Sequence, residues 1–254
     1  MKIGLDLGST AIKAVFVDGE ELIWRGLAPT APGQGAIAAR LIEEGRQALN
    51  LSSVAGVRLA STGYGRNLFQ AAEVIVDEIS ANARGLFHLS GGRARTVINI
   101  GGQDVKVLIL DEKGRVTDFR MNDKCAAGTG RFFELAARIL DTPLESFGEL
   151  GSRAQEEVEL NSTCVVFAES EIVSLLSRGI ARESVIKALN ASVARRVAGL
   201  LGRDLGGPVW LDGGPAQNLG LVEALENELM AEVRVLEAAQ YTVAYGAALS
   251  AASR

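Results

Sequence analysis

The chain has 254 residues, of which 48% are hydrophobic and 22% charged, and its formal net charge at pH 7 is −5. This composition is typical of a globular protein with a sizeable core, and the length allows one large domain or two modest ones. The acidic balance argues against nucleic acid or an anionic membrane as a partner. No apolar run reaches the ~18 residues that a membrane-spanning helix needs.

The start of the chain and its cysteine content indicate where the protein works. The segment MKIGLDLGST turns to glycine and polar residues too early for a signal peptide. Two cysteines, Cys125 and Cys164, do not make a disulfide framework. We therefore expect a cytoplasmic protein whose thiols are reduced and are catalytic, metal-binding or simply buried.

Hydrophobic periodicity predicts an alternation of strands and helices along the whole chain. We expect the glycines and the proline at 206–208 to end the longest of the helices. In chain order the predicted elements are a glycine hairpin at 4–20, a helix at 35–49, a strand at 54–62, a helix at 78–89, a second glycine hairpin at 98–114, helices at 128–140, 165–179 and 183–205, a strand at 208–214, a helix at 221–230, a strand at 232–237 and a helix at 242–254.

The two glycine hairpins resemble each other. A shift of 93 positions superposes GLDLGSTAIKAVFVDGE on INIGGQDVKVLILDEKG, so that Gly8 matches Gly101 and Lys13 matches Lys106. Each copy consists of a strand, a glycine-rich turn and a second apolar strand. An internal repeat of this size predicts two related α/β domains that face each other, although a coincidence between two hairpins would give the same pattern.

Three glycine turns follow predicted strands and could bind a nucleotide together. The first is DLGST at 6–10, the second GGQD at 101–104 and the third DGG at 212–214. Glycine lets backbone N–H groups approach an anion, Lys13 could add positive charge near phosphate, and Asp6 could hold a metal through water. One such turn is usually only a tight turn, but three are harder to dismiss. Neither the P-loop nor the dinucleotide fingerprint occurs.

Each cysteine comes just before a predicted amphipathic helix. Cys125 lies in MNDKCAAGTGRFFE and Cys164 in NSTCVVFAESE. A helix N-terminus offers positive partial charge and free N–H donors to an anion such as an iron–sulfur cluster. A [4Fe-4S] cluster needs four thiolates, so two chains related by a twofold axis would be required. The spacing alone favours two simply buried thiols, and a zinc site shared by two chains is a second alternative.

These motifs carry a resemblance that spans Ile3 to Ala251. DLGST, NIGGQD and LDGG, in this order, resemble the nucleotide loops of actin, heat-shock chaperone ATPases and sugar kinases. NIGGQDVK, MNDKCAAGTGRF, CVVFAESE and LDGGPAQN resemble the ATP-dependent activators of 2-hydroxyacyl-CoA dehydratases, a family that includes the ATPase subunits of benzoyl-CoA reductases. The third loop departs from this pattern, with Asp212 and Pro215 where relatives more often have threonine and valine.

The resemblance implies a fold, cofactors and partners. The fold is α/β, with two RNase H-like (actin-like ATPase) domains and a nucleotide cleft between them. The first domain is 1–93 plus 240–254, and the second, 94–239, carries the cysteines. The resemblance also implies a homodimer with one [4Fe-4S] cluster held by Cys125 and Cys164 of both chains. ATP and Mg²⁺ would drive one-electron transfer from a ferredoxin or flavodoxin to a partner iron–sulfur enzyme.

The nucleotide site is expected to draw on all three turns. Asp6 and Asp104 would order the metal and the attacking water, and Gln103 would orient that water. Gly128 and Gly130 would bring backbone amides to the cluster or to the nucleotide. The residues expected to bind the nucleotide or its phosphates are Gly8, Ser9, Thr10, Lys13, Gly101, Gly102, Gly128, Thr129, Gly130, Gly213, Gly214, Asn218 and Gln240.

Two other functions fit the same motifs. A kinase that phosphorylates a sugar or another small metabolite would use the same turns, with an aspartate as base and no need for the cysteines. A nucleotide-switched binding protein would hold zinc or no metal.

Overall fold

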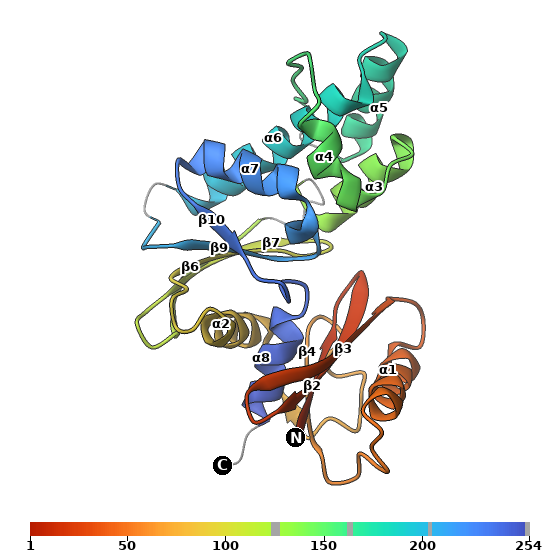
Figure 1. The fold of residues 1–254 in the computed structure, drawn as a ribbon, viewed down its shortest axis with the longest axis vertical. Coiled ribbons are helices and arrows are strands. Elements are labelled where there is room, and N and C mark those ends of the chain that lie inside the picture. Colours follow the sequence, from red (N-terminus) through yellow and green to blue (C-terminus); the bar gives the residue numbers. More distant parts are fainter. Residues whose placement is uncertain (123–127, 162–164, 203–204, 252–254) are drawn as a thin grey trace. The chain divides into compact units, whose positions relative to one another are not determined.

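The computed structural model describes residues 1–122, 128–161, 165–202 and 205–251, and the chain forms two compact units (Figure 1). Unit 1 comprises Met1–Ala94, Leu110–Thr117 and Gln240–Arg254, and unit 2 comprises Arg95–Ile109 and Asp118–Ala239. The tip of one hairpin, Leu110–Thr117, therefore belongs with unit 1. The predicted domain boundaries and the predicted cleft stay predictions.

Unit 1 is built on a mixed five-stranded sheet with the order β3-β2-β1-β4-β5. The strands β1 and β2 and the strands β2 and β3 pair antiparallel, whereas β4 is parallel to β1 and β5 is parallel to β4. The strands are β1 (Lys2–Leu7), β2 (Ala11–Asp18), β3 (Glu21–Pro29), β4 (Arg58–Thr62) and β5 (Val74–Ile75).

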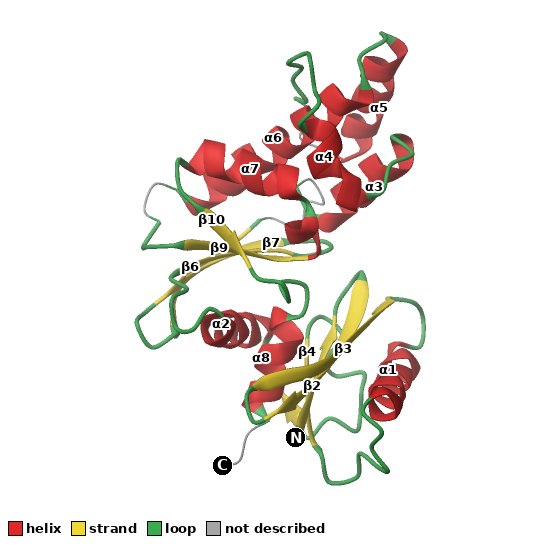
Figure 2. Ribbon diagram, viewed as in Figure 1, coloured by secondary structure: helices red, strands yellow, loops and turns green. Residues whose placement is uncertain are grey.

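Helices cover both faces of the unit 1 sheet (Figure 2). Alternate residues of β1, such as Ile3 and Leu5, pack with Leu41 of the first helix in one core. On the opposite face Gly4 lies so close to the last helix that a Cβ would sit 2.0 Å from the carbonyl oxygen of Ala244. The helices are α1 (Gln34–Ala48), α2 (Glu78–Leu89) and α8 (Thr242–Ser250).

Unit 2 repeats the sheet of unit 1. Its order is β10-β9-β6-β7-β8, with β6 antiparallel to β7 and parallel to β9. Read from the other edge, this is the order of unit 1 with each strand number raised by five. The strands are β6 (Thr96–Ile100), β7 (Val105–Leu110), β8 (Val116–Met121), β9 (Val209–Gly213) and β10 (Val233–Val235). The predicted internal repeat is therefore confirmed.

The helices of unit 2 gather on one face of its sheet (Figure 2). Ile98 and Val107 of the sheet share one core with Phe133, Ile172 and Leu189 of three helices. No helix in the described part of the chain is long and apolar enough to cross a membrane. The helices are α3 (Gly130–Ile139), η1 (Leu144–Ser146), α4 (Phe147–Gly151), α5 (Val165–Ser177), α6 (Arg182–Leu201), η2 (Gly214–Gln217) and α7 (Leu219–Leu229).

The predicted elements agree with the structure except in a few places. The helix α6 ends at Leu201 and not near Gly206, because Gly202 adopts a φ of 76° that interrupts the helix. The sequence pattern missed β3, β5 and β8, because all three are edge strands with mostly exposed or half-exposed side chains, and β5 has only two residues. It also missed the short α4. The predicted α/β class with two related units is confirmed.

The contact between α2 and α8 gives a test of the unit 1 packing. A Cβ on Gly246 would lie 1.8 Å from the carbonyl oxygen of Ala81, so Gly246→Ala must displace backbone. We expect this variant to lower the free energy of unfolding by about 2 kcal/mol in urea titrations. Among the described residues, nothing lies within 4 Å of a Cβ built on Gly199 in α6. Gly199→Ala is therefore the control, with unchanged or up to ~1 kcal/mol higher stability. Equal loss in both variants would contradict the packing.

Candidate functional site

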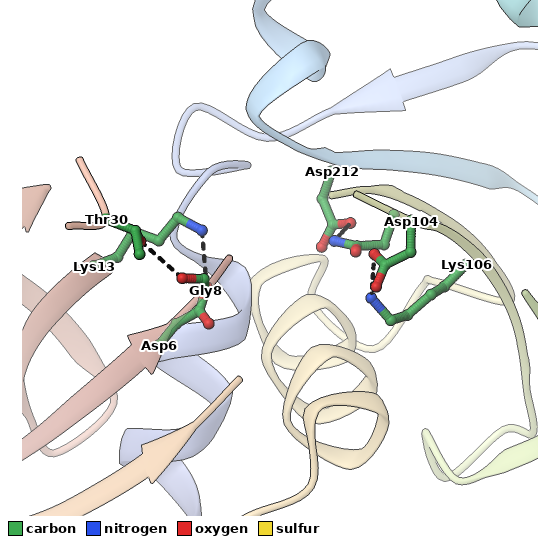
Figure 3. Close-up of polar contacts among 8 residues, drawn as sticks. Asp6, Gly8, Lys13, Thr30, Asp104, Lys106 and Asp212 are labelled. Atoms are coloured by element: carbon green, nitrogen blue, oxygen red, sulfur yellow. Dashed lines mark hydrogen bonds and ion pairs between the residues drawn. The ribbon is translucent and has the colours of Figure 1, made fainter. Parts of the chain in front are cut away.

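The first glycine turn connects β1 to β2 and is held by the end of β3. The Thr30 hydroxyl donates a hydrogen bond to the Gly8 carbonyl at 2.8 Å, and the Thr30 amide donates to the Thr10 carbonyl at 2.9 Å (Figure 3). A Cβ on Gly8 would lie 2.7 Å from the Ala11 carbonyl oxygen. The turn therefore needs glycine at this position, and its shape is set by a neighbouring strand.

A lysine and an aspartate face each other beside this turn. Asp6 and Lys13 are paired in the β1–β2 register, and the Lys13 ammonium lies 2.8 Å from Asp6 Oδ2 (Figure 3). Asp6 is only 5% exposed. A Cβ on Gly8 would lie 3.4 Å from Lys13 Nζ, so the ammonium group and the turn backbone come together. This combination of a cation and open backbone is suited to phosphate.

The second glycine turn, between β6 and β7, has the same plan. The Gly101 amide donates to the Asp104 carbonyl at 2.9 Å and closes the turn. The Lys106 ammonium lies 2.6 Å from Asp104 Oδ1, and Lys106 is 4% exposed (Figure 3). Lys106 is paired with Asn99 in the strand register, as Lys13 is with Asp6. Each of the two turns is thus followed by a lysine whose ammonium group is paired with an aspartate at that turn.

In unit 1 the carboxylate beside the lysine is Asp6 of β1, whereas in unit 2 it is Asp104 of the turn itself. Asn99 occupies the position in unit 2 that Asp6 occupies in unit 1, and it is paired in turn with Asp212 of β9. Asn99 Nδ2 donates to Asp212 Oδ1 at 2.6 Å, and Asp212 is fully buried. Sequence reasoning did not single out Asn99, although the 93-residue repeat sets it opposite Asp6.

The third glycine turn packs against the end of β6. Gly213 has a φ of 95°, and a Cβ there would lie 2.1 Å from the Ile100 carbonyl oxygen, so only glycine fits. Asn218, five residues later, is fully buried and caps α7 by accepting hydrogen bonds from the amides of Gly220 and Leu221. Its Nδ2 donates to Asn190 Oδ1 at 2.7 Å. Asn218 thus has a structural role, and its contact with a nucleotide stays a prediction.

The second glycine turn is hydrogen-bonded to the first residues of α3. The Gly130 amide donates to the Gly101 carbonyl at 2.8 Å, and the Arg131 amide donates to the Gly102 carbonyl at 3.0 Å. A Cβ on Gly130 would lie 3.1 Å from the Gly101 oxygen. Both amides therefore make hydrogen bonds within the protein. The amide of Gly130 is the one predicted above to face the cluster or the nucleotide.

The two cysteines, Cys125 and Cys164, lie outside the described residues. The helices predicted after them are confirmed, since α3 begins at Gly130 and α5 at Val165. Both helices contribute to the same unit 2 core. Within the described ranges no group of three metal-binding side chains is present.

The remaining predicted site residues fall into both units. Ser9 and Thr10 are half-buried in the first turn, and Thr129 is fully buried at the start of α3. Gln103 is exposed in the second turn, whereas Gln240 is half-buried just before α8. Their roles as ligands stay predictions.

The whole chain matches a known family. The model of the BadF/BadG/BcrA/BcrD ATPase family matches residues 3–251. The chain belongs to this family. The activator of lactoyl-CoA dehydratase from Anaerotignum propionicum is 41% identical over 251 residues, which cover 98% of this chain and 96% of the relative.

Two further proteins support this assignment. The (R)-2-hydroxyglutaryl-CoA dehydratase activating ATPase of Acidaminococcus fermentans is 41% identical over 252 residues, with 98% of this chain and 96% of the relative covered. The solved activator of the 2-hydroxyisocaproyl-CoA dehydratase from Clostridium difficile with bound ADPNP is 39% identical and has a TM-score of 0.93 over 98% of this chain and 93% of its own. The resemblance and the actin-like ATPase fold predicted from the motifs are confirmed.

The ion pair between half-buried Lys13 and buried Asp6 gives a second test. Lys13→Met leaves the nearly buried Asp6 carboxylate without its cation, and we expect a loss of about 3 kcal/mol in the free energy of unfolding. The double variant Asp6→Asn/Lys13→Met removes both charges and should recover more than half of this loss. Arg115→Met is the matched control, because the Arg115–Asp111 pair is exposed on the arginine side and should contribute less than ~0.5 kcal/mol. A double variant that is less stable than Lys13→Met would contradict the pairing.

Proposed function

We propose that this chain is an ATP-dependent activator that delivers single electrons to a partner iron–sulfur enzyme such as a 2-hydroxyacyl-CoA dehydratase. Its membership of the ATPase family, and two relatives at 41% identity that are dehydratase activators, support this proposal. A ferredoxin or flavodoxin supplies the electron, and ATP drives its transfer.

The nucleotide is bound by the turns of both units. Phosphoryl transfer needs positioning and charge stabilisation more than covalent chemistry, and backbone amides with a nearby lysine supply both. In this proposal Gly213 and Gly214 lie toward the nucleoside, and Gln103 orients the attacking water. The residues that contact the phosphates are Gly8, Ser9, Thr10, Lys13, Gly101 and Gly102.

Magnesium fits the residues beside the first two turns. Mg²⁺ prefers oxygen ligands, keeps several waters, and is usually bound by one or two carboxylates together with phosphates. Asp6 and Asp104 each place a carboxylate next to a glycine turn, held there by Lys13 and Lys106. We propose that these two carboxylates order the metal and the attacking water. Bound Mg²⁺ neutralises phosphate charge.

The two cysteines and the helices that follow them suit an iron–sulfur cluster. Cys125 and Cys164 precede α3 and α5, whose N-termini favour anions. Two copies of the chain supply the four thiolates that a [4Fe-4S] cluster needs, which is why we propose a homodimer. The cluster, when bound, accepts and releases one electron at a time.

The observation that carries the proposal is the junction between the second glycine turn and α3. Two hydrogen bonds, from the Gly130 and Arg131 amides to the Gly101 and Gly102 carbonyls, join the turn to the helix that follows Cys125. A change in the turn on nucleotide binding or hydrolysis is therefore passed directly to this helix. ATP can drive the transfer only because it interacts differently with the two states of this junction.

The cluster assignment is tested by anaerobic purification. We expect a brown dimer with broad absorption near ~400 nm and about four irons and four sulfides, measured by chemical analysis and native mass. Cys125→Ala and Cys164→Ala should each lose most of this iron, because each removes two of the four thiolates. A colourless protein that phosphorylates a metabolite with both cysteines replaced would establish a kinase instead. Full iron content in Cys125→Ala would also end the proposal.

The junction is tested by a variant that separates the turn from α3. Gly130→Ala brings a methyl group to 3.1 Å from the Gly101 oxygen, a contact tight enough that the turn backbone and the start of α3 must give way by a few tenths of an ångström. In the wild-type protein we expect a chelator to remove cluster iron at different rates with ATP and with ADP. In Gly130→Ala the ratio of these rates should fall toward one, by about fivefold or more.

The control for this experiment is Gly199→Ala, which adds the same methyl group to a helix of the same unit in open space. It should keep the wild-type ratio. If Gly130→Ala also keeps that ratio while its iron content is normal, the junction does not transmit the nucleotide state.

A further inference from the structure

Thr62 has a buried hydroxyl group that the proposed mechanism does not use. It is the last residue of β4 and is fully buried, and its Oγ1 has no hydrogen-bond partner among the described residues. A buried hydroxyl without a partner is costly, so such a group in a folded protein usually meets a bound water or ligand.

The sheet register places this hydroxyl next to Asp6. β1 and β4 are parallel, and Asp6 is paired with Thr62. Paired residues of neighbouring strands point to the same face of the sheet. On the other side of Asp6 the register continues to Lys13. Lys13, Asp6 and Thr62 therefore form one polar row across three adjacent strands.

The two oxygens of Asp6 face opposite ends of this row. Oδ2 accepts the ammonium group of Lys13 at 2.8 Å. Oδ1 lies against the backbone that follows Thr62, because a Cβ on Gly63 would be 2.4 Å from it. Gly63 has a φ of 87°, and the Gly65 amide donates to the Leu7 carbonyl at 2.8 Å. The loop after Thr62 is thus folded over the end of β1, beside the first glycine turn.

Unit 2 contains an equivalent polar row, in which the third residue, Asp212, has a hydrogen-bond partner. Lys106, Asn99 and Asp212 are paired across β7, β6 and β9. There the third residue accepts a hydrogen bond from the central one, from Asn99 Nδ2 to Asp212 Oδ1 at 2.6 Å. In unit 1 the central residue is a carboxylate, which cannot donate. Two acceptor oxygens and a hydroxyl beside a phosphate-binding turn suit a hydrated cation, since each can accept from metal-bound water.

We infer that Thr62, together with Asp6, positions a water molecule of the hydrated divalent cation that accompanies the nucleotide. The inference rests on the proposed binding of ATP phosphates by the first glycine turn and adds Thr62 to that site as a positioning residue. Gly63 contributes by leaving room for the Asp6 carboxylate, since any side chain there would collide with it.

The test compares Thr62→Val, which keeps the shape of the side chain and removes its hydroxyl, with Thr62→Ser, which keeps the hydroxyl. ATP binding is measured by calorimetry in EDTA and at increasing Mg²⁺, and the Mn²⁺–ATP complex is followed by electron paramagnetic resonance. We expect Thr62→Val to need about tenfold more Mg²⁺ for half-maximal effect, with unchanged ATP affinity in EDTA. Thr62→Ser should lie within about twofold of the wild-type protein.

Ser61→Ala provides the matched control on the same strand. The Ser61 hydroxyl is also buried but is already satisfied, because it donates to the Arg66 carbonyl at 2.7 Å. Its removal should leave the Mg²⁺ requirement unchanged. Thr62→Val should unfold at the same temperature as the wild-type protein or at a higher one, because it loses only an unsatisfied hydroxyl.

Three outcomes overturn the inference. If Thr62→Val and the wild-type protein share one Mg²⁺ requirement and one Mn²⁺ spectrum while both bind ATP, the inference fails and the proposed function stands. If ATP affinity falls equally with and without Mg²⁺, Thr62 contacts the nucleotide or only supports the fold. If the wild-type protein does not bind ATP, the inference and the proposed function fail together.

Discussion

The ammonium groups of Lys13, which is half-buried, and Lys106, which is buried, are the constraint on which both glycine turns depend. A lysine can stay charged inside a protein only beside a compensating oxygen, and in each unit an aspartate at the neighbouring turn supplies it. The strand register brings each lysine to the end of the sheet where the turn begins. The pairing thus holds a positive charge under an open glycine backbone, which is the arrangement that a phosphate group needs.

The two units use one plan with different chemistry at the centre of the sheet. In unit 1 the central strand carries a carboxylate, Asp6, next to a threonine, whereas in unit 2 it carries an amide, Asn99, next to a buried carboxylate. In unit 2 the Asn99 amide donates a hydrogen bond to the Asp212 carboxylate, so these two groups are paired with each other. Unit 1 keeps acceptor oxygens available beside its turn. The same polar row thus carries different chemistry in the two copies of the duplicated fold, and we propose that only the row of unit 1 faces a hydrated cation.

The start of α3 is joined to the second glycine turn. Its first two amides are hydrogen-bonded to the second glycine turn. Because the backbone of the turn itself satisfies the end of the helix, the two cannot move independently without leaving N–H groups unpaired. In the function we propose, this shared end of the turn and the helix is where the nucleotide state is passed on.

The sequence by itself determined the repeat, the three glycine turns, the longer helices and the family. Each of these has a local signature: glycines after apolar strands, a lysine five residues after Gly8 and after Gly101, and helical periodicity. Only the tertiary structure decided which distant residues share a face. Asn99 meets Asp212 across 113 positions, and Thr62 meets Asp6, through parallel pairing that has no local signature. The edge strands β3 and β8 escaped detection for a related reason, since mostly exposed strands have no buried apolar run. Register between parallel strands is set by the packing of the helices that connect them, and that packing exists only once the chain has folded.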